Sequence, residues 1–207
     1  MKHNLLILAL VLVAGQLFAA NSGEQLAASL ERHLQSLKSL EIQYQAAGAA
    51  DGKTIEGRMI FVKPNRFYHD TPEWTVCRTG DEQWRYLKAQ NTLIIEPASQ
   101  DYTVSPQSAL FNLERDFHVV GLDTLASGDR ELKLEPVKSN VTGELTLDFP
   151  SGASIPNALG FTSPDGGVLH YTISRWDENV KLDASLFTPP SVPPENRVDF
   201  RGAGKGQ

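Results

Sequence analysis

The sequence predicts an α+β protein in which many short strands form one antiparallel sheet, curled or barrel-like, with short helices beside it. The strand segments have an apolar period of two residues, and turns rich in Gly, Pro, Asn and Asp separate them, as in antiparallel sheets. The regular alternation of strands and helices that builds a parallel sheet is absent. A length of 207 residues with ordinary apolar content allows one domain with a sizeable core.

Residues 1–20 have the pattern of a signal peptide that is removed on export. A short basic start precedes an apolar run from Leu5 to Val13, and small residues end the segment. The apolar run is too short to span a bilayer as a helix. Residues 12–16 look like a lipobox in which Gln16 replaces the cysteine that carries the lipid. We therefore expect an exported, soluble protein without a lipid anchor.

Ser22 and Gln25 form a capping box, which predicts that a helix begins there. From Leu40 to Tyr44 the apolar period changes to two, so this helix leads directly into a strand. The apolar stripe of the helix fits packing on a sheet and equally a lid over a lipid cavity, because both need the same surface. The stripe consists of Leu26, Leu30, Leu34 and Leu37.

Further strands are predicted on both sides of a second helix. Pro64 marks a corner, Gly80-Asp81 a tight turn, and Pro97 the end of a strand. Ser105-Pro106 begins the second helix, whose apolar face extends to Phe117 and which either plugs one end of the sheet or belongs to a lid. The strands are expected at residues 53–62, 67–68, 75–77, 84–86, 91–96, 132–134, 143–149 and 169–176.

The stretch from Gly57 to Tyr86 resembles a motif of the LolA family, the periplasmic lipoprotein carriers. A Gly-led strand runs into Lys-Pro-Asn-Arg-Phe at residues 63–67, and a glycine turn leads to Trp-Arg-Tyr at residues 84–86. The family usually has Arg before the proline and Asp before the glycine of the turn. This chain has Lys63 and Thr79 at those two places.

A second phrase of the family, Phe-x-Pro-Pro, is matched by residues 187–190, where the double proline is expected to end the last strand. The resemblance thus covers about residues 22–190. It implies a curved antiparallel sheet, an incomplete β-barrel, which a lid of short helices covers. It also implies one carrier domain over residues 21–200 and a flexible tail at residues 201–207.

The resemblance further implies a periplasmic carrier that binds the acyl chains of lipoproteins, or of a related lipid, in an apolar cavity. Such a carrier takes its acylated cargo from an inner-membrane lipoprotein-releasing transporter and delivers it to an outer-membrane acceptor. We expect the carrier to be a monomer. The alternative is a periplasmic lipid-sensing or protein-interaction module on the same scaffold.

The predicted lipid-contacting residues are apolar side chains of both helices and of the signature strands. Each of them suits an ordinary core equally well, and a shift of one residue along a strand would exchange the two faces. In the family, the arginine before the proline is understood to bind the lid backbone. Lys63 is predicted to take this latch role with one point charge and no planar fork. The predicted contacts are Leu30, Leu34, Met59, Phe61, Phe67, Leu110 and Phe111.

The sequence contains no motif of an enzyme, a metal site or a nucleic-acid-binding protein. The net charge of −6 and the lack of a Lys/Arg cluster argue against nucleic acid as a partner. Neither Gly-x-Ser-x-Gly nor His-Glu-x-x-His occurs, and the five histidines are far apart. Cys77 is the only cysteine, so no intramolecular disulfide forms and the thiol is expected to pack in the core. We expect neither catalysis nor a metal or other cofactor.

Overall fold

The computed structural model describes residues 22–48, 54–98, 110–137, 143–162 and 167–201. The expected signal peptide, the start of the second helix at Ser105-Pro106 and most of the expected tail lie outside these residues. The chain divides into two compact units, and the single domain over residues 21–200 stays a prediction. Within the described residues, unit 1 holds 22–36 and 110–170, and unit 2 holds 37–98 and 171–201.

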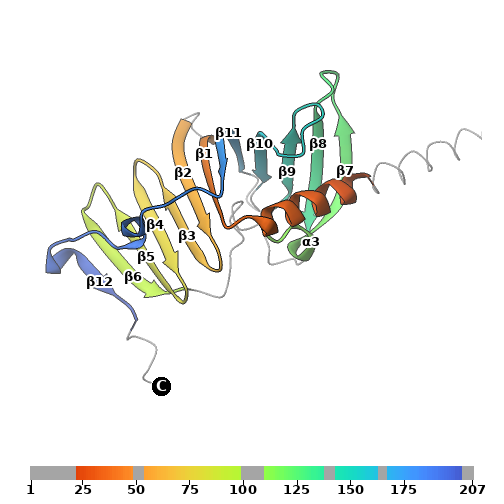
Figure 1. Cartoon of the computed structure of the whole chain (residues 1–207). Helices are drawn as coiled ribbons and strands as arrows, with labels where there is room; N and C mark the ends of the chain where they lie inside the picture. Colours follow the sequence, from red (N-terminus) through yellow and green to blue (C-terminus); the bar gives the residue numbers. More distant parts are fainter. Residues whose placement is uncertain (1–21, 49–53, 99–109, 138–142, 163–166, 202–207) are drawn as a thin grey trace, which may run out of the picture. The chain divides into compact units, whose positions relative to one another are not determined.

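Unit 2 is built from six antiparallel strands that lie side by side in chain order (Figure 1). They are β1 (Ser39–Gly48), β2 (Thr54–Val62), β3 (Arg66–Asp70), β4 (Trp74–Thr79), β5 (Glu82–Leu87) and β6 (Thr92–Pro97). Next to β1 lies β11 (Val168–Glu178), whose residues 171–178 belong to this unit. Gly80, with φ of 61°, forms the predicted tight turn between β4 and β5.

The strand register divides the side chains of unit 2 between two faces. Paired residues on neighbouring antiparallel strands point to the same side, and successive residues along a strand alternate. The side that we call the front face contains two register pairs, Met59 with His69 and Phe61 with Phe67. The opposite side, the back face, contains a continuous row made by Ile60, Tyr68, Cys77, Trp84 and Ile95.

The C-terminal segment covers the back face of unit 2. Asp183 accepts a hydrogen bond from the backbone N–H of Ser185 (2.9 Å) and so caps the 3-10 helix η1 (Ala184–Phe187). The carbonyl oxygen of Phe187 accepts a hydrogen bond from Trp84 Nε1 (3.4 Å), and its ring packs against Tyr68. Together with Val192, this ring completes an apolar core over Cys77, Trp84, Leu93 and Ile95.

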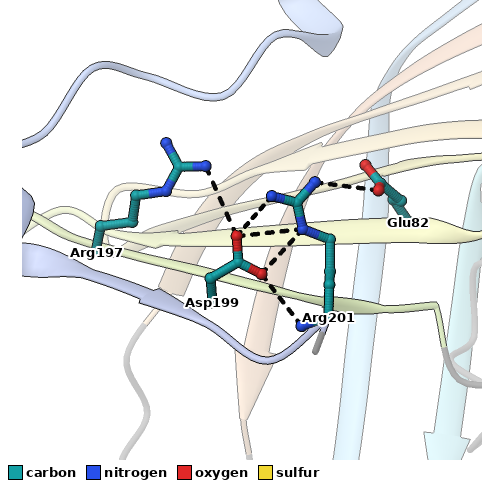
Figure 2. Close-up of polar contacts among 4 residues, drawn as sticks. All are labelled: Glu82, Arg197, Asp199 and Arg201. Atoms are coloured by element: carbon teal, nitrogen blue, oxygen red, sulfur yellow. Dashed lines mark hydrogen bonds and ion pairs between the residues drawn. The ribbon is translucent and has the colours of Figure 1, made fainter. Parts of the chain in front are cut away.

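The chain ends its cover of the back face with η2 (Pro194–Asn196) and β12 (Arg197–Asp199), which pairs parallel with β6. Figure 2 shows how this strand is held: the Arg201 guanidinium donates to both oxygens of Asp199 and to Glu82 Oε1 (3.1 Å). The expectation that the double proline ends the last strand is therefore wrong. The three residues of β12 are too few to show an alternation of apolar and polar side chains. They form a strand because the edge of β6 offers hydrogen-bonding partners.

Unit 1 consists of a second group of strands with a helix across it. The strands follow one another from β7 (Phe117–Thr124) through β8 (Arg130–Pro136) and β9 (Leu145–Phe149) to β10 (Ala158–Thr162), beside residues 168–170 of β11. The helix at residues 22–36, predicted from its capping box, lies across this group (Figure 1). Gly23 approaches β7 so closely that a Cβ atom there would lie 2.8 Å from Val119 Cγ1.

The second predicted helix is much shorter than expected. The described part is α3 (Leu113–Asp116), and Phe117, which we expected on the helix, begins β7 instead. Phe117 pairs with Pro136 of β8, and the β-branched residues Val119 and Val120 that follow it suit a strand. Pairing with a strand that is distant in sequence therefore overrides the apparent helical spacing. The Glu114 backbone N–H donates to Glu31 Oε2 (2.7 Å), which joins α3 to the first helix.

The sheet is open. Within the described residues, β12 in unit 2 and β7 in unit 1 each have a strand neighbour on one side only, so the strands do not close into a barrel. The predicted α+β class, an antiparallel sheet of many strands with few helices, is confirmed. Among the described helices, none has the length and apolarity needed to cross a membrane.

Candidate functional site

The front face of unit 2 carries a cluster of aromatic rings on an apolar floor. The rings of Phe61 and Phe67 have centroids 5.0 Å apart, and the Trp74 ring lies 4.6 Å from His69. Met59 is 2% exposed, whereas Phe61, Phe67 and Trp74 are only partly buried. The front face therefore presents apolar and aromatic side chains that a ligand with apolar chains can contact without breaking a hydrogen bond.

A polar pair lies within this aromatic cluster. The Tyr44 hydroxyl and His69 Nε2 are 2.6 Å apart and both residues are buried, so each satisfies the other. Burial lowers the pKa of His69 to about 4 and raises the pKa of Tyr44. Both side chains are therefore neutral at pH 7, and the front face carries no charge at this point.

Gly57 makes room for Tyr44. These two residues are partners in the β1–β2 register, and a Cβ atom on Gly57 would lie 2.2 Å from both Cζ and the hydroxyl oxygen of Tyr44. The glycine that opens the signature stretch is thus a steric requirement for the ring that crosses it.

The free energy of unfolding is expected to decrease as the pH is lowered from 6.5 to 4, because of His69. Its folded pKa of about 4 is below the unfolded value of 6.5, so its contribution is complete above pH 6.5 and is lost as the pH falls towards 4. The full loss is about 3 kcal/mol in the free energy of unfolding. Urea titrations at pH 7 and pH 4 should show a smaller decrease for His69→Leu than for the wild type. Equal decreases in the two proteins would show that His69 is not the cause of the pH dependence.

The structure brings together three of the seven predicted lipid contacts. Met59, Phe61 and Phe67 share the front face of unit 2. The remaining four lie in unit 1: Leu30 and Leu34 are buried on the first helix, Leu110 is buried, and Phe111 is partly buried. Their contact with lipid stays a prediction.

Sequence reasoning missed Tyr44, His69, Trp74 and Tyr171, whose rings complete the front-face cluster. A signal for two of them was present, because Tyr44 and His69 each lie two residues beyond an apolar front-face residue on the same strand. A histidine in a strand does not reveal a buried partner, so its role emerges only from the register.

Lys63 lies in the turn between β2 and β3, where its side chain is exposed. The backbone N–H of Lys63 donates to Lys38 O (3.0 Å), and the Gly80 N–H donates to Asn65 O (3.3 Å). The Pro-Asn part of the signature therefore forms a turn that has a backbone hydrogen bond to a neighbouring segment on each side. The latch role of the Lys63 side chain stays a prediction.

Cys77 is buried on the back face, where its Sγ lies 3.9 Å from Phe187 O. Burial raises the pKa of this thiol to about 11, so it is protonated at neutral pH. Across the described part of the chain, no group of His, Cys, Asp or Glu side chains is placed to hold a metal ion.

The sequence model of a protein family, "Outer membrane lipoprotein carrier protein LolA", matches residues 35–190, which is well over half of the chain. This protein belongs to the LolA family. Members of the LolA family are binding and carrier proteins rather than enzymes, they take lipid or lipoprotein cargo, and they are typically extracytoplasmic. The resemblance noted in the signature stretch is confirmed, and a general role in binding lipid or lipoprotein is supported.

A solved structure of low sequence identity shares the fold of this LolA family member. It is an uncharacterized conserved protein from Thermus thermophilus, 15% identical, with a TM-score of 0.55 over 86% of this chain and 99% of that chain. Two others are less similar. A LolA superfamily protein from Nitrosomonas europaea is 12% identical, with a TM-score of 0.44 and coverage of 83% and 98%. The lipoprotein LppX from Mycobacterium tuberculosis is 13% identical, with a TM-score of 0.44 and coverage of 77% and 99%. No curated protein sequence matches this chain significantly.

Proposed function

We propose that this protein is a periplasmic carrier that binds the acyl chains of lipoproteins, or of a related lipid, and moves them from the inner to the outer membrane. The observation that carries the proposal is the front face of unit 2, where the partly buried rings of Phe61 and Phe67 lie beside the buried Met59 and form an apolar surface in a LolA-family chain. A transporter of the inner membrane would load the carrier, and an acceptor of the outer membrane would unload it.

The energy of acyl-chain burial limits how this carrier works. Burial stabilises a bound chain by about 0.8 kcal/mol per CH₂, so complete burial of three long chains would give tens of kcal/mol. Non-covalent affinities do not exceed about 18–21 kcal/mol, and cargo bound more tightly would never be released. The carrier must therefore bury only part of the chains, or hold the empty binding face covered at a comparable cost.

Native mass spectrometry of the protein purified from periplasm tests the proposal. Mild activation in the gas phase should eject a bound acylated protein or peptide. A bound free lipid would keep the carrier role and change the cargo to a related lipid. An empty protein that also fails to extract lipoproteins from spheroplasts would contradict the proposal and favour a sensor or interaction module on the same scaffold.

The latch role predicts that Lys63→Ala weakens closure and accelerates release of cargo to the acceptor. Because one exposed point charge contributes less than about 1 kcal/mol, the expected increase in transfer rate is about two- to fivefold. Transfer of a fluorescent lipoprotein from the loaded carrier to acceptor-containing vesicles measures the rate. Lys181→Ala removes an exposed lysine of the same unit and should have no effect. Equal rates for all three proteins would show that Lys63 is no latch.

A further inference from the structure

A polar groove of about 460 Å³ lies in unit 2 where β3 stops short of β2. Residues Arg58–Val62 of β2 pair with β3, but the preceding residues of β2 pair only with β1. This step in the sheet leaves open space beside the start of β2. The side chains that matter for binding in this groove are Gln43, Gln45, Glu56, Arg58, Asp70 and Lys88.

The groove lies beside the open edge of β2, because the start of β2 pairs only with β1. Gln43, Arg58 and Asp70 form one row of the register and point to the back-face side. Tyr44 also lines the groove, and its ring contacts His69 and Tyr171 in the front-face cluster. A lipid whose apolar chains lie on the front face would pass around this edge of β2 to place its polar group in the groove.

The cations of the groove are already paired. The Arg58 guanidinium donates to both oxygens of Glu41 through Nε and Nη2, each at 2.8 Å. Lys88 Nζ lies 2.8 Å from Asp70 Oδ1 and donates to Thr71 O (2.5 Å). The exposed carboxylate of Glu56 accepts a hydrogen bond from Gln45 Nε2 (3.2 Å). The two cations, Arg58 and Lys88, thus lie among three carboxylates. These are Glu41, Glu56 and Asp70, so the groove has no net electrostatic attraction for an anion.

Hydrogen-bonding capacity of both kinds remains. A guanidinium has five N–H donors and an ammonium three, and only part of them is used by the partners just described. The amide groups of Gln43 and Gln45 donate to Glu41 and Glu56, which leaves their amide oxygens as acceptors. Donors are thus available near Arg58 and Lys88, and acceptors near Gln45 and Glu56. This distribution suits a ligand that itself carries both signs of charge.

We propose that the groove binds the zwitterionic head group of a phospholipid, with the phosphate near Arg58 and Lys88 and the ammonium near Glu56. The inference rests on the proposed function, because the acyl chains of the same lipid would lie on the front face. It adds a preference among lipids that a purely apolar surface cannot provide.

Head-group selection from mixed vesicles tests the inference. The protein is incubated with vesicles of equal parts phosphatidylethanolamine and phosphatidylglycerol that have identical acyl chains, and the bound lipids are counted by mass spectrometry. The wild type should retain phosphatidylethanolamine about fivefold in excess. Glu56→Lys places a cation at the ammonium position and should lower this ratio by about tenfold, so that phosphatidylglycerol is favoured.

The matched control is Glu195→Lys, which makes the same charge change at an exposed position of unit 2 away from the groove. This variant should retain the wild-type ratio. Equal retention of both lipids by the wild type, or equal effects of the two substitutions, would overturn the head-group site while the carrier function stands. Retention of neither lipid would overturn the head-group site, and a failure to bind lipoprotein as well would overturn the proposed function.

Discussion

Phe61→Glu is expected to reduce acyl-chain binding by at least about 100-fold, because it places a carboxylate in the apolar part of the front face. The Phe61 ring contacts Phe67, its register partners are Leu40 and Phe67, and it is only partly buried. The charge can therefore reach water in the empty protein but not beneath a bound acyl chain. Displacement of a fluorescent fatty acyl probe measures the affinity.

Leu125→Glu is the control for this substitution. Leu125 is 50% exposed and lies in unit 1, outside the front face, and the substitution introduces the same charge. Its affinity for the probe should equal that of the wild type, and thermal melting should show that both variants are folded. Undiminished binding by a folded Phe61→Glu protein would show that the front face does not bind the chains.

Gly57→Ala is expected to lower the free energy of unfolding by about 2–3 kcal/mol. The new methyl group would lie 2.2 Å from Tyr44 Cζ, so the ring must move and give up its 2.6 Å hydrogen bond to His69. Both polar groups of the pair are buried, which adds the cost of leaving them without a partner. Urea denaturation at pH 7 measures the change.

Two further variants identify the clash as the cause. Gly121 has open space where a Cβ atom would be, so Gly121→Ala should change the stability by less than about 1 kcal/mol. Tyr44→Leu removes the ring, and adding Gly57→Ala to this variant should cost much less than adding it to the wild type. Equal costs in the two backgrounds would show that the ring is not the reason for the glycine.

The hairpins of unit 2 were predictable because their signals are local. The alternation from Leu40 to Tyr44, the proline corner at Pro64 and the glycine turn at Gly80 each act within a few residues and need no tertiary partner. Period-two alternation also places Met59 and Phe61 on one face, and the register brings Phe67 opposite Phe61. The strands of the candidate lipid-binding surface were therefore within reach of the sequence.

The missed features depend on contacts between distant residues. Phe117 has a helical spacing with Leu113 and becomes strand because it pairs with β8. β12 has three residues and exists because β6 offers an edge. The Tyr44–His69 pair joins two strands, and the groove arises because β3 is shorter than β2. None of these differences in pairing or length is visible in a local pattern.

The parallel pairing of β12 with β6 also determines the order in which this chain can fold. Unit 2 contains residues from both sides of unit 1 in the sequence, and its back-face core needs Phe187 and Val192. A chain that is synthesised from its N-terminus presents β1 to β6 long before the residues that cover Cys77 and Trp84. Contacts of such long sequence separation form slowly, so these side chains remain open to other partners until synthesis is nearly complete. The last residues to emerge thus complete the core begun by the first hairpins.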